Sequence, residues 1–280
     1  MKLSFLQGRV VPELPLVMGI LNLTPDSFYE GSRHGQTREV VETAGRMLDE
    51  GATLIDLGAV STRPGALEIT EEEELERLIP SVEAILSQYP GCLLSVDTYR
   101  SGVARAAVEH GVVMVNDVYG GRYDGTMIPT VAELEVPYVI MHMKGTPASM
   151  QENPVYSDVV AEVGYFLEKQ ADHCRSVGIR QVILDPGFGF GKTQEHNFRL
   201  LTSLHHFRVP GTMLLAGLSR KSMIWRSLGC TPGEALNGTT VLNTLALAGG
   251  ADILRVHDVK EAVEAVALYR LFREAGNIQT

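Results

Sequence analysis

Two aspartates and an asparagine stand at the ends of apolar runs that read as strands. They are Asp97, Asn116 and Asp185, at the ends of three separate runs. Such side chains can accept hydrogen bonds from N–H-rich ligands, coordinate Mg²⁺ or act as bases. Together they predict binding of an aminopyrimidine-type ring edge, because a site for metal alone is expected to use more acids. The alternative is that each one only caps the helix or loop that follows.

Basic residues gather near other strand ends. Arg255 and His257 lie two apart on the last predicted strand, so their side chains share one face. In residues 219–222, Ser-Arg-Lys-Ser, a strand end passes into a helix, and Arg63 adds a guanidinium from the second loop. In a chain of net charge −10, these cations predict an anionic substrate group, phosphate or diphosphate. The alternative is a surface salt-bridge role, above all for Arg220.

Asn22 ends the first predicted strand, and its neutral amide oxygen suits a Mg²⁺ ion that keeps most of its waters and bridges to substrate phosphate. The glycine-rich residues 187–193 look like a P-loop, but Pro186 stands where its first glycine is required. We expect a tight glycine loop there, with Phe190 as a stacking wall and Lys192 in solvent.

Other polar residues are assigned supporting roles. His142, at the end of the fifth run, is expected to support the site from behind. The acidic run 71–74 follows Thr70 and is expected to begin a helix rather than bind metal. No serine has the Gly-x-Ser-x-Gly setting of a nucleophile, so covalent catalysis is not expected.

These residues must be positioned by a pattern of strand, loop and helix that recurs along the chain. The predicted strands are 16–22, 53–58, 92–97, 112–118, 136–142, 181–185, 212–217 and 251–257. Segments with helical periodicity fill most of the intervals. The alternation predicts an α/β fold, a single (β/α)8 TIM-barrel domain over residues 1–280. The C-terminal strand ends of such a barrel converge on one mouth, where the polar residues would form one site.

The sequence also predicts where helices end and which loops are long. Glycines expected to cap helices before the next strand are Gly51, Gly111, Gly178 and Gly250. Three loops, 24–36, 60–68 and 143–156, exceed the usual length of roughly 2 to 6 residues. All three would lie at the mouth, and we expect the first two to be mobile without substrate.

Composition excludes several classes of protein. The net charge of −10 disfavours nucleic-acid binding. Three widely spaced cysteines, Cys92, Cys174 and Cys230, indicate neither a disulfide framework nor a zinc ribbon. No apolar stretch is long enough for a signal peptide or a membrane span, so we expect a cytoplasmic protein.

Eight short segments carry motif-like sequences: 19–28, 61–66, 95–98, 115–118, 141–147, 184–192, 217–222 and 255–258. In this order they resemble the successive motifs of bacterial dihydropteroate synthases, over almost the whole chain. The resemblance implies condensation of (7,8-dihydropterin-6-yl)methyl diphosphate with 4-aminobenzoate. The products would be 7,8-dihydropteroate and diphosphate, in folate biosynthesis, the step that sulfonamides target.

The resemblance also implies residue roles. The implied pterin ligands are Asp97, Asn116, Asp185 and Lys221. The implied diphosphate ligands are Asn22, Thr62, Arg63, Arg255 and His257, with Asn22 also on Mg²⁺. The implied 4-aminobenzoate ligands are Phe28, Pro64, Phe190, Lys221 and Ser222. The implied catalytic residues are Lys221, Arg63, Arg255 and His257. A homodimer through the last helices is implied too; the apolar stretch 240–248 is compatible, although a buried barrel helix would look the same.

Two positions depart from the family pattern. Val60 stands where an acidic or amide residue is common, and Glu30 where aspartate is usual. Glu30 keeps the charge, so we expect its pairing with Arg63 to survive, whereas Val60 is expected to alter hydrogen bonding in the second loop.

Two other functions are compatible with part of this pattern. A pterin-dependent methyltransferase shares the barrel and a similar pterin pocket, but its methyl carrier has no diphosphate, so the cations argue against it. A catalytically silent pterin-binding protein would not need the residues Asn22, Arg63, Lys221, Arg255 and His257. Pterin binding without turnover would favour that second alternative.

Overall fold

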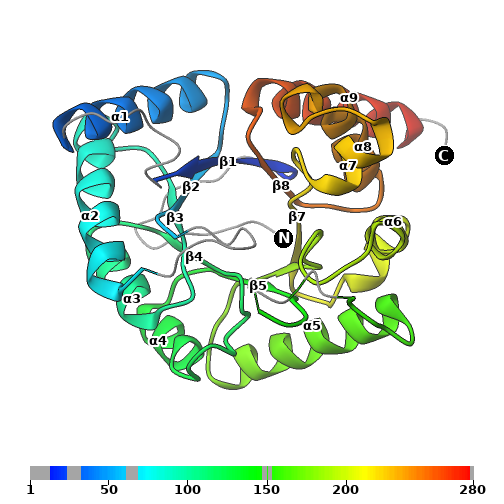
Figure 1. Ribbon diagram of the computed structural model, residues 1–280, viewed down its shortest axis with the longest axis horizontal. Coiled ribbons are helices and arrows are strands. Elements are labelled where there is room, and N and C mark those ends of the chain that lie inside the picture. Colours follow the sequence, from blue (N-terminus) through cyan, green and yellow to red (C-terminus); the bar gives the residue numbers. More distant parts are fainter. Residues whose placement is uncertain (1–12, 24–32, 61–68, 147–149, 151–152, 278–280) are drawn as a thin grey trace.

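The computed structural model describes residues 13–23, 33–60, 69–146, 150 and 153–277. In this part of the chain eight parallel strands close into a barrel in sequence order, with helices around it (Figure 1). The strands are β1 (Leu16–Asn22), β2 (Leu54–Gly58), β3 (Leu94–Asp97), β4 (Met114–Asp117), β5 (Tyr138–Met141), β6 (Val182–Asp185), β7 (Met213–Ala216) and β8 (Ile253–Val256). The predicted (β/α)8 barrel is confirmed, and every predicted strand range contains the observed strand.

Helices occupy the intervals between strands. They are α1 (Arg33–Asp49), α2 (Glu71–Gln88), α3 (Ser101–Glu109), α4 (Met127–Leu134), α5 (Val159–Ser176), α6 (Gln194–Thr202), α7 (Ser222–Leu228), α8 (Leu236–Ala248) and α9 (Val259–Asn277), with 3-10 turns η2 (Leu204–Phe207) and η3 (Pro232–Glu234). The predicted loop 24–36 extends too far, because helix α1 begins at Arg33.

The predicted helix boundaries are confirmed by their backbone. Thr70 caps α2, its hydroxyl accepting the Glu73 N–H while the Glu73 carboxylate accepts the Thr70 N–H. The four glycines expected before strands have φ values between 97° and 103°, a region that only glycine adopts without strain. No helix in the described ranges is long and apolar enough to span a bilayer.

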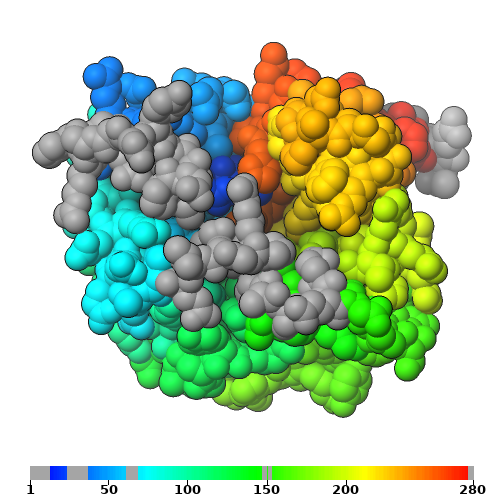
Figure 2. Space-filling model, viewed as in Figure 1, coloured from blue at the N-terminus to red at the C-terminus, as the bar shows by residue number. Residues whose placement is uncertain are grey.

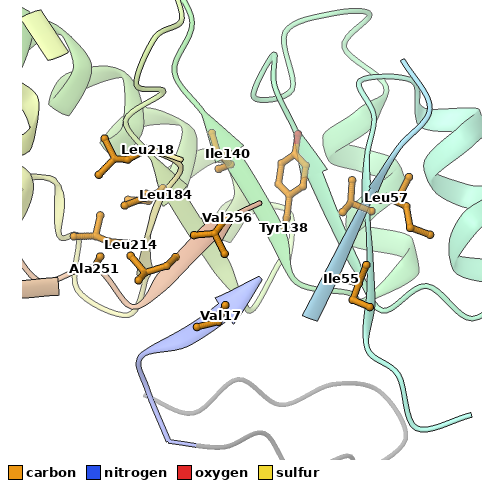
Figure 3. Packing of buried hydrophobic residues seen from close by; sticks show 14 of the residues in the cluster. Val17, Ile55, Leu57, Tyr138, Ile140, Leu184, Leu214, Leu218, Ala251 and Val256 are labelled. Carbon is orange, nitrogen blue, oxygen red and sulfur yellow. The ribbon is translucent and has the colours of Figure 1, made fainter. Parts of the chain in front are cut away.

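Strand alternation divides the core into two layers. The layer between strands and helices includes Val17, Ile55, Leu184, Leu214 and Val256 (Figure 3). The layer inside the barrel includes Leu16, Met18, Leu54, Leu93, Met114, Val139, Ile183, Met213, Leu215 and Ile253. Because side chains alternate with a period of two, the residues two and four positions beyond the inner layer also point inward, toward the mouth.

Candidate active site

Seven of the inward positions at the mouth carry polar side chains, whereas the inner layer below them is apolar. They are Asn22, Asp56, Asp97, Asn116, Asp185, Arg255 and His257, each two or four residues beyond an inward position of the same strand. Strand geometry therefore brings predicted site residues from separate strands together at the C-terminal mouth of the barrel. Asp56 ends a predicted apolar run but was given no role from the sequence; its parity with Leu54 is the signal that could have found it.

Arg255 lies among these polar side chains and contacts two of the carboxylates. Its Nε donates to Asp56 Oδ2 at 2.6 Å and its Nη2 to Asp97 Oδ2 at 2.7 Å. Asn116 Nδ2 donates to the same Asp56 oxygen at 2.9 Å. Burial alone would lower the pKa of Arg255, but the two carboxylates outweigh it and raise that pKa. Burial raises the pKa of Asp97 to about 7, against the opposing effect of Arg255.

Two glycines provide the space between these side chains. Gly58 and Gly217 stand at inward positions of β2 and just beyond β7. A Cβ at Gly58 would lie 3.6 Å from Asn22 Oδ1 and 3.8 Å from Asp97 Oδ2. Neither glycine has a positive φ, so the role of each is to omit a side chain rather than to permit a special backbone conformation.

Lys221 and Asp185 lie on the other side of this space. A Cβ at Gly217 would be 3.7 Å from Lys221 Nζ and 3.9 Å from Asp185 Oδ2. Burial lowers the pKa of Lys221 to about 8, although Asp185 opposes this. Lys221 Nζ donates to the Phe188 carbonyl and lies 4.9 Å from the centroid of the Phe190 ring. The Phe190 ring therefore lies beside the ammonium, and its role as a stacking wall for a ligand stays a prediction.

The loops after β7 and β8 are joined by two neighbouring contacts. Ser219 Oγ lies 3.0 Å from His257 Nδ1 and accepts the His257 N–H at 3.1 Å. Desolvation and the charge of Arg255 lower the pKa of His257 to about 4, which weakens the case for a permanent positive charge on this imidazole. The sequence had counted it among the cations.

Arg220 does not face the anion site, which corrects its grouping with the other cations. Its Nε and Nη2 donate to the two carboxylate oxygens of Asp258 at 2.9 and 2.7 Å. Its Nη1 donates to the carbonyls of Pro232 and Gly233. A guanidinium with four of its donor contacts made inside the protein has little left for a ligand. The alternative salt-bridge role is therefore the observed one.

Lys192 is a second correction, because its side chain is only 3% exposed and not in solvent. Its Nζ lies 3.0 Å from His142 Nδ1. Burial lowers the pKa of His142 to about 2, which keeps the imidazole neutral. His142 thus contacts the glycine loop from behind, the supporting place expected for it.

Several predicted residues lie outside the described residues. These are Phe28, Glu30, Thr62, Arg63 and Pro64, together with the expected mobility of the loops that contain them. Among the residues that are described, no three His, Cys, Asp or Glu side chains are grouped as a metal site. The Asn22 amide oxygen borders the cavity beside Asp97, which suits a cation held mainly by water and by substrate oxygens.

The arrangement offers two kinds of ligand contact in one cavity. Asp97, Asp185 and Asn116 supply hydrogen-bonding groups suited to the edge of an N–H-rich ring. Arg255 and Lys221 supply positive charge for an anionic group. Such a cavity at the C-terminal mouth of a (β/α)8 barrel is a place for catalysis by positioning and electrostatics.

Comparison with known proteins identifies the class first. The model of the pterin binding enzyme family matches residues 18–257, which include β1 and His257. The chain is therefore a member of the pterin-binding enzyme family with a barrel fold.

The particular family follows from individual relatives. Dihydropteroate synthase of Escherichia coli (strain K12) is 46% identical over 257 residues, covering 90% of this chain and 89% of that protein. The crystal structure of the Yersinia pestis enzyme with a sulfonamide drug has a TM-score of 0.88 at 40% identity, covering 98% of this chain and 100% of that one. Xanthomonas albilineans dihydropteroate synthase in complex with 7,8-dihydropteroate has a TM-score of 0.84 at 39% identity, covering 95% and 97%. The chain belongs to the dihydropteroate synthase family and is a transferase with dihydropteroate synthase activity.

The substitution Asp56→Asn should destabilise the protein by about 3 kcal/mol at pH 7, because it leaves the buried Arg255 guanidinium with one carboxylate fewer. Chemical denaturation followed by circular dichroism measures this. The matched control is Asp172→Asn, at an exposed pair 3.5 Å from Arg175, where we expect a loss below about 0.5 kcal/mol. Equal losses in the two variants would contradict the assignment of Arg255 as a buried charge that depends on Asp56.

Proposed function

We propose that the described cavity carries out the condensation of (7,8-dihydropterin-6-yl)methyl diphosphate with 4-aminobenzoate to give 7,8-dihydropteroate and diphosphate. The observation that carries this proposal is the position of Arg255, which borders the Asp97 carboxylate at 2.7 Å. A ring-binding acceptor and an anion-binding guanidinium are thus adjacent, as the two halves of the pterin substrate require. A methyl carrier has no diphosphate for Arg255 to bind, so the methyltransferase alternative is not favoured.

The pterin ring would lie between β3, β4 and β6. Asp97 and Asp185 would accept its N–H groups, and Asn116 would complete the contact from β4. Asp185 Oδ1 already accepts the Gly187 N–H at 2.7 Å, which fixes the orientation of its carboxylate. Lys221, beside Asp185, would donate to a ring acceptor. Arg255 Nη2 also donates to Asp97 Oδ2 at 2.7 Å, so binding of the pterin N–H groups to Asp97 would exchange part of that ion pair for ligand contacts.

The diphosphate would leave toward Arg255, with His257 at the rim, and Thr62 and Arg63 of the second loop would be further ligands of it. Asn22 would hold Mg²⁺, which would neutralise charge on the departing diphosphate. Positive charge from Arg255 stabilises the leaving group, so the bond to the pterin methylene carbon can break before the new bond forms. The electron-rich pterin spreads the positive charge left on that carbon.

The arylamine nitrogen then attacks the methylene carbon with its lone pair, which is free at neutral pH. The proton that the nitrogen afterwards loses passes to the departing diphosphate or to water, so no strong general base is needed. The 4-aminobenzoate would lie against Phe190 and Lys221, with its carboxylate near Ser222 at the start of α7 and with Phe28 and Pro64 from the first two loops. The loops after β1 and β2 would exclude water, which otherwise adds to the same cation.

We further propose that the chain forms one domain over residues 1–280, acts in the cytoplasm and is a homodimer. The dimer surface would be the apolar side chains exposed on α8 and α9, namely Val241, Leu245, Leu268, Leu271 and Phe272, between 50% and 75% exposed. These two helices lie together at one side of the molecule (Figures 1 and 2). A second copy of the chain covering this surface would remove the largest exposed apolar side chains of that side from water.

Diphosphate release tests the reaction. With Mg²⁺, pterin diphosphate and 4-aminobenzoate, release should match dihydropteroate formation, and Arg255→Lys should lower kcat/KM by about 10²-fold, because lysine keeps the charge but loses the fork contact. Arg180→Lys, an exposed residue before β6, is the control and should change nothing. Tight pterin binding by the unmodified chain without diphosphate release would reject the proposal and favour the silent pterin-binding protein.

Pterin binding should depend on pH through Asp97. Burial raises the pKa of Asp97 to about 7, so its carboxylate is increasingly protonated below that pH and loses acceptor capacity. Affinity for 6-hydroxymethylpterin, which has no phosphate to titrate, should therefore fall by about tenfold for each pH unit below 6. Calorimetry from pH 5 to 8 measures it. The variant Asp97→Asn should bind weakly at every pH; a slope that persists in this variant would assign the dependence to another group.

Dimer formation can be tested on α9. The double substitution Leu268→Asp and Phe272→Asp should shift the sedimentation of the protein from dimer to monomer, because it places charges in the proposed apolar contact. The control pair Tyr165→Asp and Val177→Asp changes exposed apolar residues at α5, which are 65% and 40% exposed, and should leave the dimer intact. A monomeric unmodified chain would contradict this part of the proposal.

A further inference from the structure

The loop between β6 and α6 is pressed against the end of β5. Gly187, Gly189 and Gly191 have φ values of 71°, 82° and 64°, which L side chains rarely adopt. A Cβ at Gly187 would collide with the carbonyl oxygen of His142, and one at Gly191 with that of Lys144. The glycines therefore permit the close approach, but they do not by themselves supply an attraction that holds the loop there.

The Lys192 amine supplies that attraction from inside the loop. Its Nζ contacts the carbonyl oxygens of Gly187 at 2.9 Å, Phe190 at 3.0 Å and His142 at 3.2 Å. It also lies 3.0 Å from His142 Nδ1. Burial lowers the pKa of Lys192, whereas three carbonyl acceptors favour the ammonium form, which has three N–H donors to match. One side chain thus ties both ends of the glycine loop to β5.

The remaining polar groups of the loop are held from outside. Tyr156 Oη donates to the Gly191 carbonyl at 2.8 Å. Asn197 Oδ1 accepts the Gly189 N–H at 2.7 Å. With Lys192 inside and these two residues outside, the loop is clamped on both faces, although it has no regular secondary structure of its own.

This clamped loop contacts Asp185 and Lys221 at four points. The Gly187 N–H orients the Asp185 carboxylate. The Phe188 carbonyl accepts from Lys221 Nζ, and the Phe190 ring lies beside the same ammonium. The stem of Lys221 passes Gly189, since a Cβ there would be 3.3 Å from Lys221 Cδ. The place of the Lys221 ammonium is therefore set by the loop backbone.

We infer that Lys192 is a positioning residue for the second substrate: it gathers the carbonyls of the glycine loop and so holds Phe190 and Lys221 where 4-aminobenzoate binds. The inference rests on the proposed function for the identity of that substrate. Lys192 itself touches no ligand in this role, because its amine is enclosed by protein acceptors and its side chain is 3% exposed. Its effect passes through the loop.

The substitution Lys192→Met keeps the length of the side chain and removes every donor. We expect the KM for 4-aminobenzoate to rise about tenfold while kcat falls less than about threefold, as when ground-state and transition-state binding are lost alike. The control Lys169→Met, at an exposed lysine on α5, should leave both constants unchanged. A Lys192→Met protein that melts at a lower temperature with an unchanged KM would overturn the inference and leave a purely structural role.

A double-mutant cycle with Phe190→Leu tests the route of the effect. If Lys192 acts through the Phe190 wall, Lys192→Met should raise the KM by less than about twofold in the Phe190→Leu background. Additive effects would overturn the part of the inference that concerns Phe190. If Lys192→Met does not fold, Lys192→Gln, which keeps one amide donor group, is assayed with the same criteria. Absence of turnover in the unmodified chain would instead reject the proposed function, so the two failures are distinguishable.

Discussion

The ion pairs of Arg255 with Asp56 and Asp97, inside the mouth of the barrel, are the interaction on which the cavity depends. A guanidinium taken out of water is costly unless carboxylates and hydrogen bonds replace its hydration. Asp56, which is fully buried, supplies that compensation and in turn accepts from Asn116. Because the Arg255 guanidinium needs these partners, side chains from β2, β3, β4 and β8 are held in fixed positions relative to one another before a ligand binds.

The interior of the barrel is apolar in its lower layer and mostly polar at the mouth, because the inward-facing positions continue along each strand. The lower layer, with residues such as Met18 and Ile183, contributes the hydrophobic stabilisation. The upper layer gives up part of that stabilisation, since Gly58 and Gly217 leave space that a side chain would have filled. Stability and ligand binding are thus divided between the two ends of the strands, as the fold allows.

Backbone segments at the mouth are held by buried polar side chains rather than by regular structure. Lys192 ties the glycine loop to β5, and the Arg220–Asp258 fork ties the loop after β7 to the start of α9. Neither group has the free donors that a ligand would need, yet each lies within a few residues of one that does. A charged residue near an active site can therefore serve the chemistry indirectly, by fixing the carbonyl groups around it.

The sequence by itself determined the strand ranges, the barrel and the residues at the strand ends, because these depend on local periodicity and on a parallel order that places all the C-terminal ends together. The sequence also contains the family motifs, which indicate the class of substrate. Only the tertiary structure decided which charges pair. Asp56 on β2 meets Arg255 199 residues later, Arg220 turns to Asp258, and Lys192 enters the protein. The three-dimensional arrangement selects these partners, because electrostatic attraction and the free-energy cost of burial both change over a few ångströms. The spacing of residues along the chain does not contain the distances between their side chains.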